Sequence, residues 1–216
     1  MATLKAPSSN TAPERKKTYV SSADLNEPVP AVLRTEEFVL RPIVADDAEL
    51  DYAAVMETRE QLRLWRQTTW PEDDFTVEEN RKDLVECEER HLAGRAFTYT
   101  VLDPSGSECL GCVYVYPTRA TFLARAAVTP VGDDEWADVE AVVFFWARLP
   151  QMEAGMDKRL LAALRAWFAE EWKLTRTVYA TSEPFTQQVD LLGRTGMTVK
   201  FELQEPDKPR KRLVFG

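Results

Sequence analysis

A carboxylate inside an apolar run is the residue in this sequence most suited to proton transfer. The run from 139 to 147 is apolar except for Glu140 and is rich in Val and Phe, which is typical of a strand buried on both faces. Because strand side chains alternate, we expect Asp138 and Glu140 to share a face with Phe144 and Trp146. Burial there would raise the pKa of Glu140 above about 4.3, towards values at which a carboxylate accepts a proton near neutral pH. The alternative is a solvated residue at the entry of the strand.

A second candidate is the helix that follows this strand. A loop containing Gly155 leads to Asp157, which can cap a helix running to about Trp172. A helix N-terminus after a buried strand favours anions, because its first N–H groups are unpaired and its dipole end is positive. Lys158 and Arg159 lie in this first turn, as partners of an anion or as solvated side chains.

The composition is that of a soluble globular protein. The 216 residues are 44% hydrophobic and 29% charged, with a formal net charge of −9. Negative charge argues against sequence-independent nucleic-acid binding. The sequence shows no apolar run of membrane-spanning length and no signal-peptide core. Three cysteines indicate reduced thiols and the cytoplasm, and a single histidine argues against a metal site.

The order of predicted elements defines one domain. Residues 1–34 are Pro-containing and lack periodicity, so we expect a flexible or draped arm followed by a domain at 35–216. The domain begins with a short strand and three helical segments. A strand pair at 97–102 and 109–116 follows, and Gly111 is a possible bulge within it. After a long connection come the buried strand, the long helix, a strand, a helix and two strands.

In this order of elements the chain resembles the GNAT superfamily of acyl-CoA-dependent N-acyltransferases. Residues 38–42 (Phe-Val-Leu-Arg-Pro) and 46–48 (Asp-Asp-Ala) are similar to the branch that acetylates ribosomal-protein N-termini and similar amines. Residues 191–197 are similar to the last helix of the family and its end. The resemblance covers about Thr35 to Gly216. It implies an α+β fold, with a mixed, mostly antiparallel sheet of six or seven strands flanked by helices.

The resemblance also implies acetyl-CoA or another acyl-CoA as co-substrate, with no metal. The pantetheine arm would lie along Phe145, Trp146 and Ala147. The diphosphate would lie on the amides of Gly155, Met156, Asp157 and Lys158, with Arg148 or Arg159 as ion-pair partners. Glu140, or as second choice Asp138, would take the proton from the acceptor amine.

Part of the family's diphosphate loop, Gln/Arg-x-x-Gly-x-Gly/Ala, is altered in this chain. Gly155 matches it, whereas Met152 and Asp157 stand at its first and last positions. We therefore expect weaker cofactor binding than is usual for the family.

Three functions follow as hypotheses. The first is an N-acyltransferase acting on a small-molecule or peptide amine, with the acidic stretch 72–89 either attracting a cationic acceptor or simply solvated. The second is a non-catalytic sensor of CoA or another ligand. The third is an interaction module that uses exposed Trp65, Trp70 or Trp136. A homodimer is possible in each case.

Overall fold

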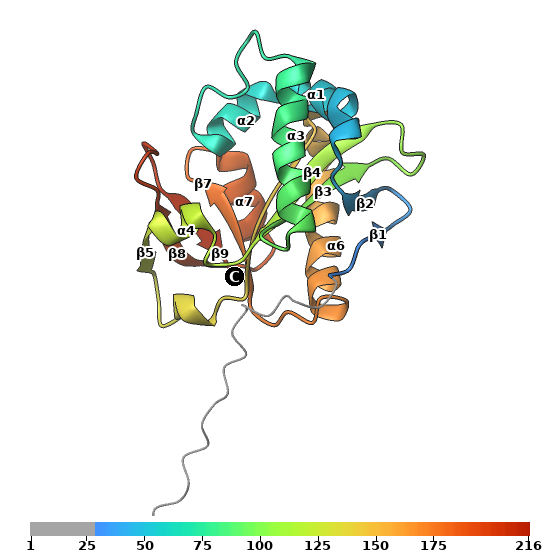
Figure 1. Ribbon diagram of the computed structural model, residues 1–216. Helices are drawn as coiled ribbons and strands as arrows, with labels where there is room; N and C mark the ends of the chain where they lie inside the picture. Colours follow the sequence, from blue (N-terminus) through green and yellow to red (C-terminus); the bar gives the residue numbers. More distant parts are fainter. Residues whose placement is uncertain (1–28) are drawn as a thin grey trace, which may run out of the picture.

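The computed structural model describes residues 29–216 (Figure 1). Most of the predicted arm therefore lies outside the described residues. Its last two residues, Leu33–Arg34, form strand β1 and pair with the next strand. The sheet thus begins two residues before the predicted domain start at Thr35.

A single mixed sheet organises the described part of the chain. Its strands lie in the order β1-β2-β3-β4-β6-β7-β9-β8-β5, and β6 with β7 is the parallel pair among antiparallel neighbours. The predicted fold class is confirmed, but six or seven strands is too few, because β1 and β5 extend the two edges of the sheet. The strands are β1 Leu33–Arg34, β2 Val39–Pro42, β3 Phe97–Leu102, β4 Cys109–Tyr116, β5 Ala127–Pro130, β6 Ala141–Ala147, β7 Thr177–Ser182, β8 Val199–Gln204 and β9 Arg212–Phe215.

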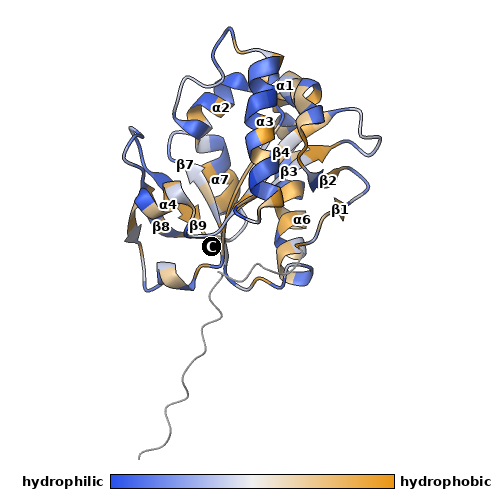
Figure 2. Cartoon of the chain, viewed as in Figure 1, coloured by the Kyte–Doolittle hydropathy of each residue, from blue (hydrophilic) through white to orange (hydrophobic). Residues whose placement is uncertain are grey.

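The helices flank this sheet. Their apolar residues face inward, and the outer side of α3 is hydrophilic (Figure 2). The α-helices are α1 Ala48–Glu57, α2 Arg59–Arg66, α3 Val77–Leu92, α4 Thr121–Arg125, α5 Leu149–Glu153, α6 Met156–Glu170 and α7 Thr186–Arg194, with short 3-10 helices η2 Ala45–Asp47 and η3 Trp136–Asp138.

The two faces of the sheet carry different helices. On the face of α1 and α3, the Thr100 hydroxyl donates to Asp47 at 3.1 Å, and Asn80 of α3 donates to the Ala48 carbonyl oxygen at 3.0 Å. On the opposite face, Trp167 of α6 packs edge-to-face on Tyr99, with ring centroids 5.1 Å apart. This layering follows from the sequence, since β3 and β6 are buried along their whole length and need cover on both sides.

Strand β4 contains the predicted bulge. Val101 pairs with Gly111 and Leu102 with Cys109, so Leu110 is an extra residue. Gly111 has φ +155°, and a Cβ there would lie 2.2 Å from the carbonyl oxygen of Trp146. The close approach of β4 to β6 therefore requires glycine at this position.

Candidate functional site

Strands β6 and β7 are paired only at their beginnings. The parallel pairing ends at Val143 and Tyr179, although β6 continues to Ala147 and β7 to Ser182. The two strands separate beyond this point. We call the space between residues 144–147 and 180–182 the β6–β7 wedge.

A side chain from α7 reaches into the β6–β7 wedge. Gln188 is 4% exposed, and its Nε2 donates to the carbonyl oxygen of Phe145 at 2.9 Å. Its Oε1 is buried without a hydrogen-bond partner among residues 29–216. The carboxamide therefore bonds to β6 as a neighbouring strand would, and it leaves one acceptor free.

The side chains of the predicted arm-binding segment belong to the core. Phe145, Trp146 and Ala147 are all buried, and Trp146 Nε1 donates to the Tyr114 hydroxyl at 3.4 Å. Only the backbone of these residues can face a ligand in the wedge, which is consistent with binding an extended arm by its amides.

The N-terminus of α6 already holds a carboxylate. Gly155 precedes the helix in the left-handed conformation, φ 72°, and Met156 at its first position is buried. Asp157 Oδ1 accepts the backbone N–H of Lys158 at 2.8 Å, and burial raises the pKa of the Asp157 carboxyl. One of the amides predicted to hold a diphosphate is thus occupied by the protein's own anion, and the Lys158 side chain is exposed.

The two predicted phosphate-binding arginines are also engaged. Arg148 Nη1 donates to Glu108 at 2.7 Å, and its Nε donates to Glu57. Arg159 makes a bidentate pair with Glu37, at 2.6 and 2.5 Å. Both guanidinium groups are therefore already paired with carboxylates of the protein. The predicted role of these two arginines in binding a diphosphate stays a prediction.

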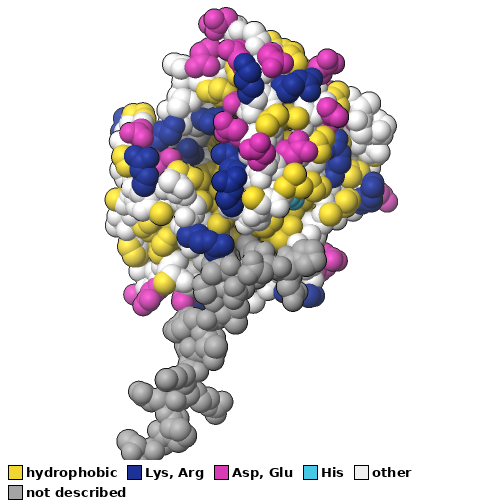
Figure 3. Space-filling view, viewed as in Figure 1, with side chains coloured by type: hydrophobic (Ala, Val, Ile, Leu, Met, Phe, Trp, Pro, Cys, Tyr) yellow, Lys and Arg dark blue, Asp and Glu magenta, His cyan; other side chains and the backbone are white. Residues whose placement is uncertain are grey.

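Beside β6 lies a cleft of about 350 Å³, which we call the aromatic cleft. Phe144 of β6 and Tyr116 of β4 meet edge-to-face in it, with centroids 5.8 Å apart. Figure 3 shows the side covered by α3, where basic, acidic and hydrophobic side chains lie close together. The cleft's aromatic lining consists of Trp65, Trp70, Tyr114, Tyr116, Phe122 and Phe144.

Both signs of charge line the aromatic cleft. Arg212 pairs with Glu205 at 2.5 Å, and its guanidinium lies 5.3 Å from the Phe144 ring centroid. Arg66 lies 4.3 Å from the Trp70 centroid, and burial lowers the pKa of Lys208. The cleft can therefore bind a polar molecule with an aromatic or aliphatic portion.

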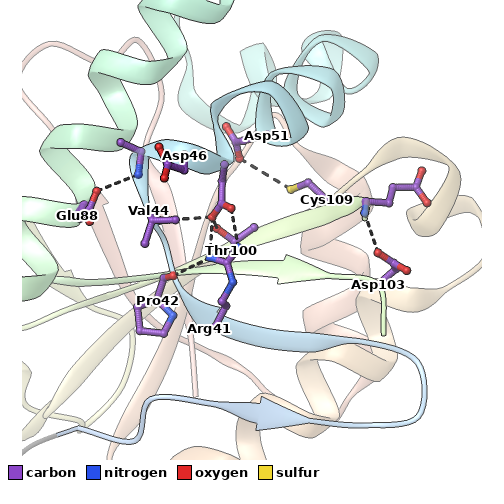
Figure 4. Close-up of polar contacts among 12 residues, drawn as sticks. Arg41, Pro42, Val44, Asp46, Asp51, Glu88, Thr100, Asp103 and Cys109 are labelled. Atoms are coloured by element: carbon purple, nitrogen blue, oxygen red, sulfur yellow. Dashed lines mark hydrogen bonds and ion pairs between the residues drawn. The ribbon is translucent and has the colours of Figure 1, made fainter. Parts of the chain in front are cut away.

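Asp51 of α1 is a buried carboxylate that also lines the cleft. Asn80 Nδ2 donates to its Oδ2 at 3.0 Å, and Figure 4 shows the carboxyl group directed towards Cys109 of β4. Burial, assisted by the negative charges of Asp47 and Asp83, raises the pKa of Asp51 to about 6. A carboxylate with this pKa can accept a proton near neutral pH.

An ion pair fixes the start of α1 and thereby the position of Asp51. Arg41 donates to both oxygens of Asp47, at 2.6 and 2.8 Å, and the Thr100 hydroxyl donates to Asp47 at 3.1 Å (Figure 4). These bonds join β2, β3 and the first turn before α1. The pair also raises the pKa of Arg41, mainly through the hydrogen bond to Asp47.

The predicted carboxylates of the β6 region do not share a strand face. Asp138 is in η3 and pairs with Arg176 at 2.8 Å. Glu140 precedes β6, and its Oε2 accepts the N–H groups of Thr175 and Arg176 at 2.7 and 2.8 Å. The expected burial of Glu140 among Phe144 and its neighbours is therefore wrong, because the β6 ladder starts only at Ala141. The catalytic roles of Glu140 and Asp138 stay predictions.

One proposed contact residue is buried, and the bulge in β4 changes the placement of two cysteines. Trp65 is 7% exposed and packs on Tyr114, so it is a core residue and not a surface contact. Cys109 and Cys112 pair with Leu102 and Thr100, which lie on one face of β3, so both thiols lie on that face because of the bulge. Strand alternation without the bulge would place them on opposite faces.

The sequence carried a weak signal for each residue that its analysis missed. Asp51 is at helical spacing from Ala48 and Val55, both buried, so a carboxylate stands on the apolar stripe of α1. Gln188 likewise lies four residues before buried Leu192 in α7. A polar residue on the apolar face of a helix is predicted to be buried and to have a specific partner. Residue spacing does not predict the cleft or the wedge that these two residues border.

Within residues 29–216, no cluster of three or more His, Cys, Asp or Glu side chains could hold a metal ion. None of the helices in this range is long and apolar enough to cross a membrane.

Comparison with known proteins defines the fold. No protein-family model and no curated protein matches the sequence, but solved structures align with most of the chain. The fold is that of the GNAT acetyltransferases, which confirms the resemblance inferred from the sequence.

Three of these structures illustrate the likeness. The ribosomal-protein-S5-alanine acetyltransferase of Vibrio fischeri is 19% identical, with 86% of this chain and 95% of that chain covered and a TM-score of 0.60. RimL, a ribosomal L7/L12 α-N-protein acetyltransferase in complex with coenzyme A, is 15% identical, with 85% and 96% covered and a TM-score of 0.62. A protein of Bordetella pertussis assigned to the GNAT family is 18% identical, with 86% and 98% covered and a TM-score of 0.58.

Proposed function

We propose that this protein is an N-acyltransferase that moves an acetyl or other acyl group from an acyl-CoA to a primary amine. The observation that carries the proposal is the β6–β7 wedge, in which strand pairing stops after Val143 and Tyr179 while both strands continue. The GNAT fold supports it, because similar structures are acetyltransferases and one of them is a complex with coenzyme A.

The wedge and the aromatic cleft meet at β6. The carbonyl of Phe145 faces the wedge, where Gln188 bonds to it, and the neighbouring Phe144 side chain lines the cleft. An acyl thioester held along the wedge would lie next to an acceptor held in the cleft. The mixed charges of the cleft suit a polar amine, either a small molecule or the N-terminus of a peptide.

The reaction requires a nucleophilic amine and an acceptor for its proton. The amine nitrogen bonds to the thioester carbonyl carbon, the C–S bond breaks, and the leaving thiolate is protonated. Asp51 lines the cleft and has a raised pKa of about 6, so it is our first candidate to take the proton from the ammonium group. Glu140 is the alternative candidate, and it would first have to release the Thr175 and Arg176 amides.

Two measurements test the proposal. We expect acetyl-CoA to raise the melting temperature, and we expect free thiol to appear when primary amines or short peptides are added. A ligand at about 100 times its Kd stabilises a protein by about 2.7 kcal/mol, which is easily measured. No melting shift at millimolar acetyl-CoA, together with no thiol release, would contradict the proposed function.

One observation favours a non-catalytic alternative, a sensor that binds a ligand without transferring an acyl group. The predicted diphosphate-binding groups Arg148, Arg159 and the Lys158 amide are all engaged by carboxylates of the protein itself. Ligand-dependent stabilisation without thiol release from any amine would support this alternative. The homodimer and the cytoplasmic location stay predictions.

A further inference from the structure

Two buried polar atoms, on residues that border the wedge, have no hydrogen-bond partner among the described residues. They are Gln188 Oε1 on α7 and Thr181 Oγ1 on β7, and both residues are almost completely buried. Buried acceptors and donors are nearly always hydrogen-bonded in folded proteins. Of the two, Gln188 Oε1 belongs to a side chain bonded to β6 at the wedge, so it is an acceptor available to an N–H donor bound there.

The geometry of Gln188 is specific for an amide chain. Its Nε2 bonds to the Phe145 carbonyl at 2.9 Å and so extends the hydrogen-bonding edge of β6 by one amide group. Its Oε1 is the next acceptor along that edge. A pantetheine arm is an extended chain with secondary amides, and an N–H of that chain can bond to Oε1.

The groups predicted to bind the diphosphate of the acyl donor are paired with carboxylates of the protein. Glu37 pairs in bidentate fashion with Arg159, Glu57 and Glu108 engage Arg148, and Asp157 accepts the Lys158 N–H. A diphosphate there competes with these charge-assisted hydrogen bonds for the two guanidinium groups and the Lys158 amide, which reduces what it adds to binding.

We propose that this protein recognises the pantetheine arm of its acyl donor through Gln188, and that the nucleotide diphosphate contributes little to binding. The inference rests on the proposed function, since it names how that donor is selected. The donor class is an acyl thioester of pantetheine, with or without the nucleotide.

Calorimetry of the full-length protein with CoA, pantetheine and adenosine 3′,5′-bisphosphate tests this inference without requiring turnover. One charge-assisted hydrogen bond to the diphosphate would make CoA bind roughly 10- to 100-fold more tightly than pantetheine. Because we infer that the diphosphate contributes little, we expect the two affinities to differ by less than about tenfold. The bisphosphate alone should not bind measurably. A preference for CoA of more than about 100-fold would overturn the inference.

Variants assign the recognition to Gln188. Gln188→Met removes the amide at similar volume and should weaken CoA and pantetheine equally, by about 10- to 100-fold. Gln187→Leu, on the exposed side of the same helix, is the matched control and should change neither affinity. Unchanged binding by Gln188→Met would show that Gln188 does not contribute to affinity, and tighter binding would show that it blocks the wedge. Either result would overturn the inference.

Glu37→Gln, at a partly exposed residue, tests the predicted diphosphate-binding group Arg159. It frees Arg159 and should strengthen CoA binding while leaving pantetheine binding unchanged. An equal effect on both ligands would contradict the assignment of Arg159 to the diphosphate end. Ligand binding as described, but with no thiol release from any amine, would contradict the proposed function and leave this inference standing. Absence of binding by either ligand would reject both.

Discussion

Asp51 is a buried carboxylate whose charged form is destabilised and which is a candidate proton acceptor. Its carboxylate is buried on α1 with Asn80 and Cys109 as partners, and it lines the aromatic cleft. Burial disfavours the charged form and raises the pKa. A carboxylate with a raised pKa at a cavity is a candidate for proton transfer.

At the scale of this residue, we expect Asp51→Asn to lower kcat/KM for acyl transfer by about 10²–10⁴-fold, because the proton acceptor is lost. The wild-type profile should rise through pH 6, the pKa of Asp51, and this rise should be absent in the variant. Residual activity should increase at high pH as the free amine becomes available. Steady-state kinetics from pH 5 to 9 checks this.

Glu140→Gln is the comparison variant. Its loop contacts to Thr175 and Arg176 lie away from the cleft lining, so we expect a smaller loss of turnover than for Asp51→Asn. A larger loss for Glu140→Gln than for Asp51→Asn would make Glu140 the proton acceptor and restore the sequence-based assignment.

Asp51→Asn should also stabilise the protein at neutral pH. Because the pKa of Asp51 is about 6 in the folded state and about 3.8 when unfolded, the folded state binds the proton more tightly. Wild-type stability therefore falls as pH rises from about 4 to 6 and is constant above it. We expect Asp51→Asn to match the wild type below pH 4 and to exceed it by up to about 3 kcal/mol at pH 8.

Urea unfolding at pH 4 and pH 8 measures this difference. Equal stabilities of the two proteins at pH 8 would show that the Asp51 carboxylate is not destabilised by burial, and would weaken its assignment as the proton acceptor.

At the level of elements, the β4 bulge determines which side chains of β4 lie beside Asp51. The extra residue Leu110 puts Cys109 on the same face as Cys112, beside α1, and lets Cys109 contact Asp51. Without the bulge, a uniform strand would turn one of these side chains to the α6 face. The bulge in turn depends on Gly111, which lies against the β6 backbone.

We expect Gly111→Ala to destabilise the protein by about 3 kcal/mol or more, because its Cβ would lie 2.2 Å from the Trp146 carbonyl oxygen and φ is +155°. Backbone atoms of two central strands cannot move apart without loss of ladder hydrogen bonds. Denaturant unfolding measures the change.

Gly106→Ala is the matched control. Gly106 also has positive φ, +77°, but no atom lies within 4 Å of a Cβ built there. Its substitution should cost only about 1–2 kcal/mol, from backbone conformation alone. Equal losses for the two variants would show that the contact with β6 adds nothing to the conformational cost.

At the scale of the whole molecule, residues 29–34 close the edge of the sheet. Val29 and Leu33 pack against the core, and the buried Tyr99 donates its hydroxyl to the Pro30 carbonyl at 2.9 Å. These contacts join the start of the described chain to β3, and they lie within the segment that the sequence assigned to the arm.

We expect a truncation of residues 1–34 to melt about 3–8 °C below a truncation of residues 1–28, because about 1–3 kcal/mol is lost when a buried hydroxyl loses its partner. Differential scanning calorimetry of the two truncated proteins gives the comparison. Equal melting temperatures would mean that the sheet is complete without β1.

Residue spacing predicted the fold class and most of the central elements, but not β1, α4 or β5. The strands at 97–102 and 109–116 begin and end where spacing predicted, and Thr76 and Glu79, three residues apart, form a capping box at the start of α3. Local rules suffice there, because strand alternation and helix capping depend on residues a few positions apart.

Only the tertiary structure decided which side chains form the site. Asp51 and Gln188 gain their roles from Cys109 of β4 and Phe145 of β6, which are 58 and 43 residues away in sequence. Glu140 was misplaced because the strand alternation that predicts its face fails outside the hydrogen-bonded ladder, which starts at Ala141. Burial and the pKa shifts that follow from it arise when distant segments pack together, so neither spacing nor residue type along the chain could supply them.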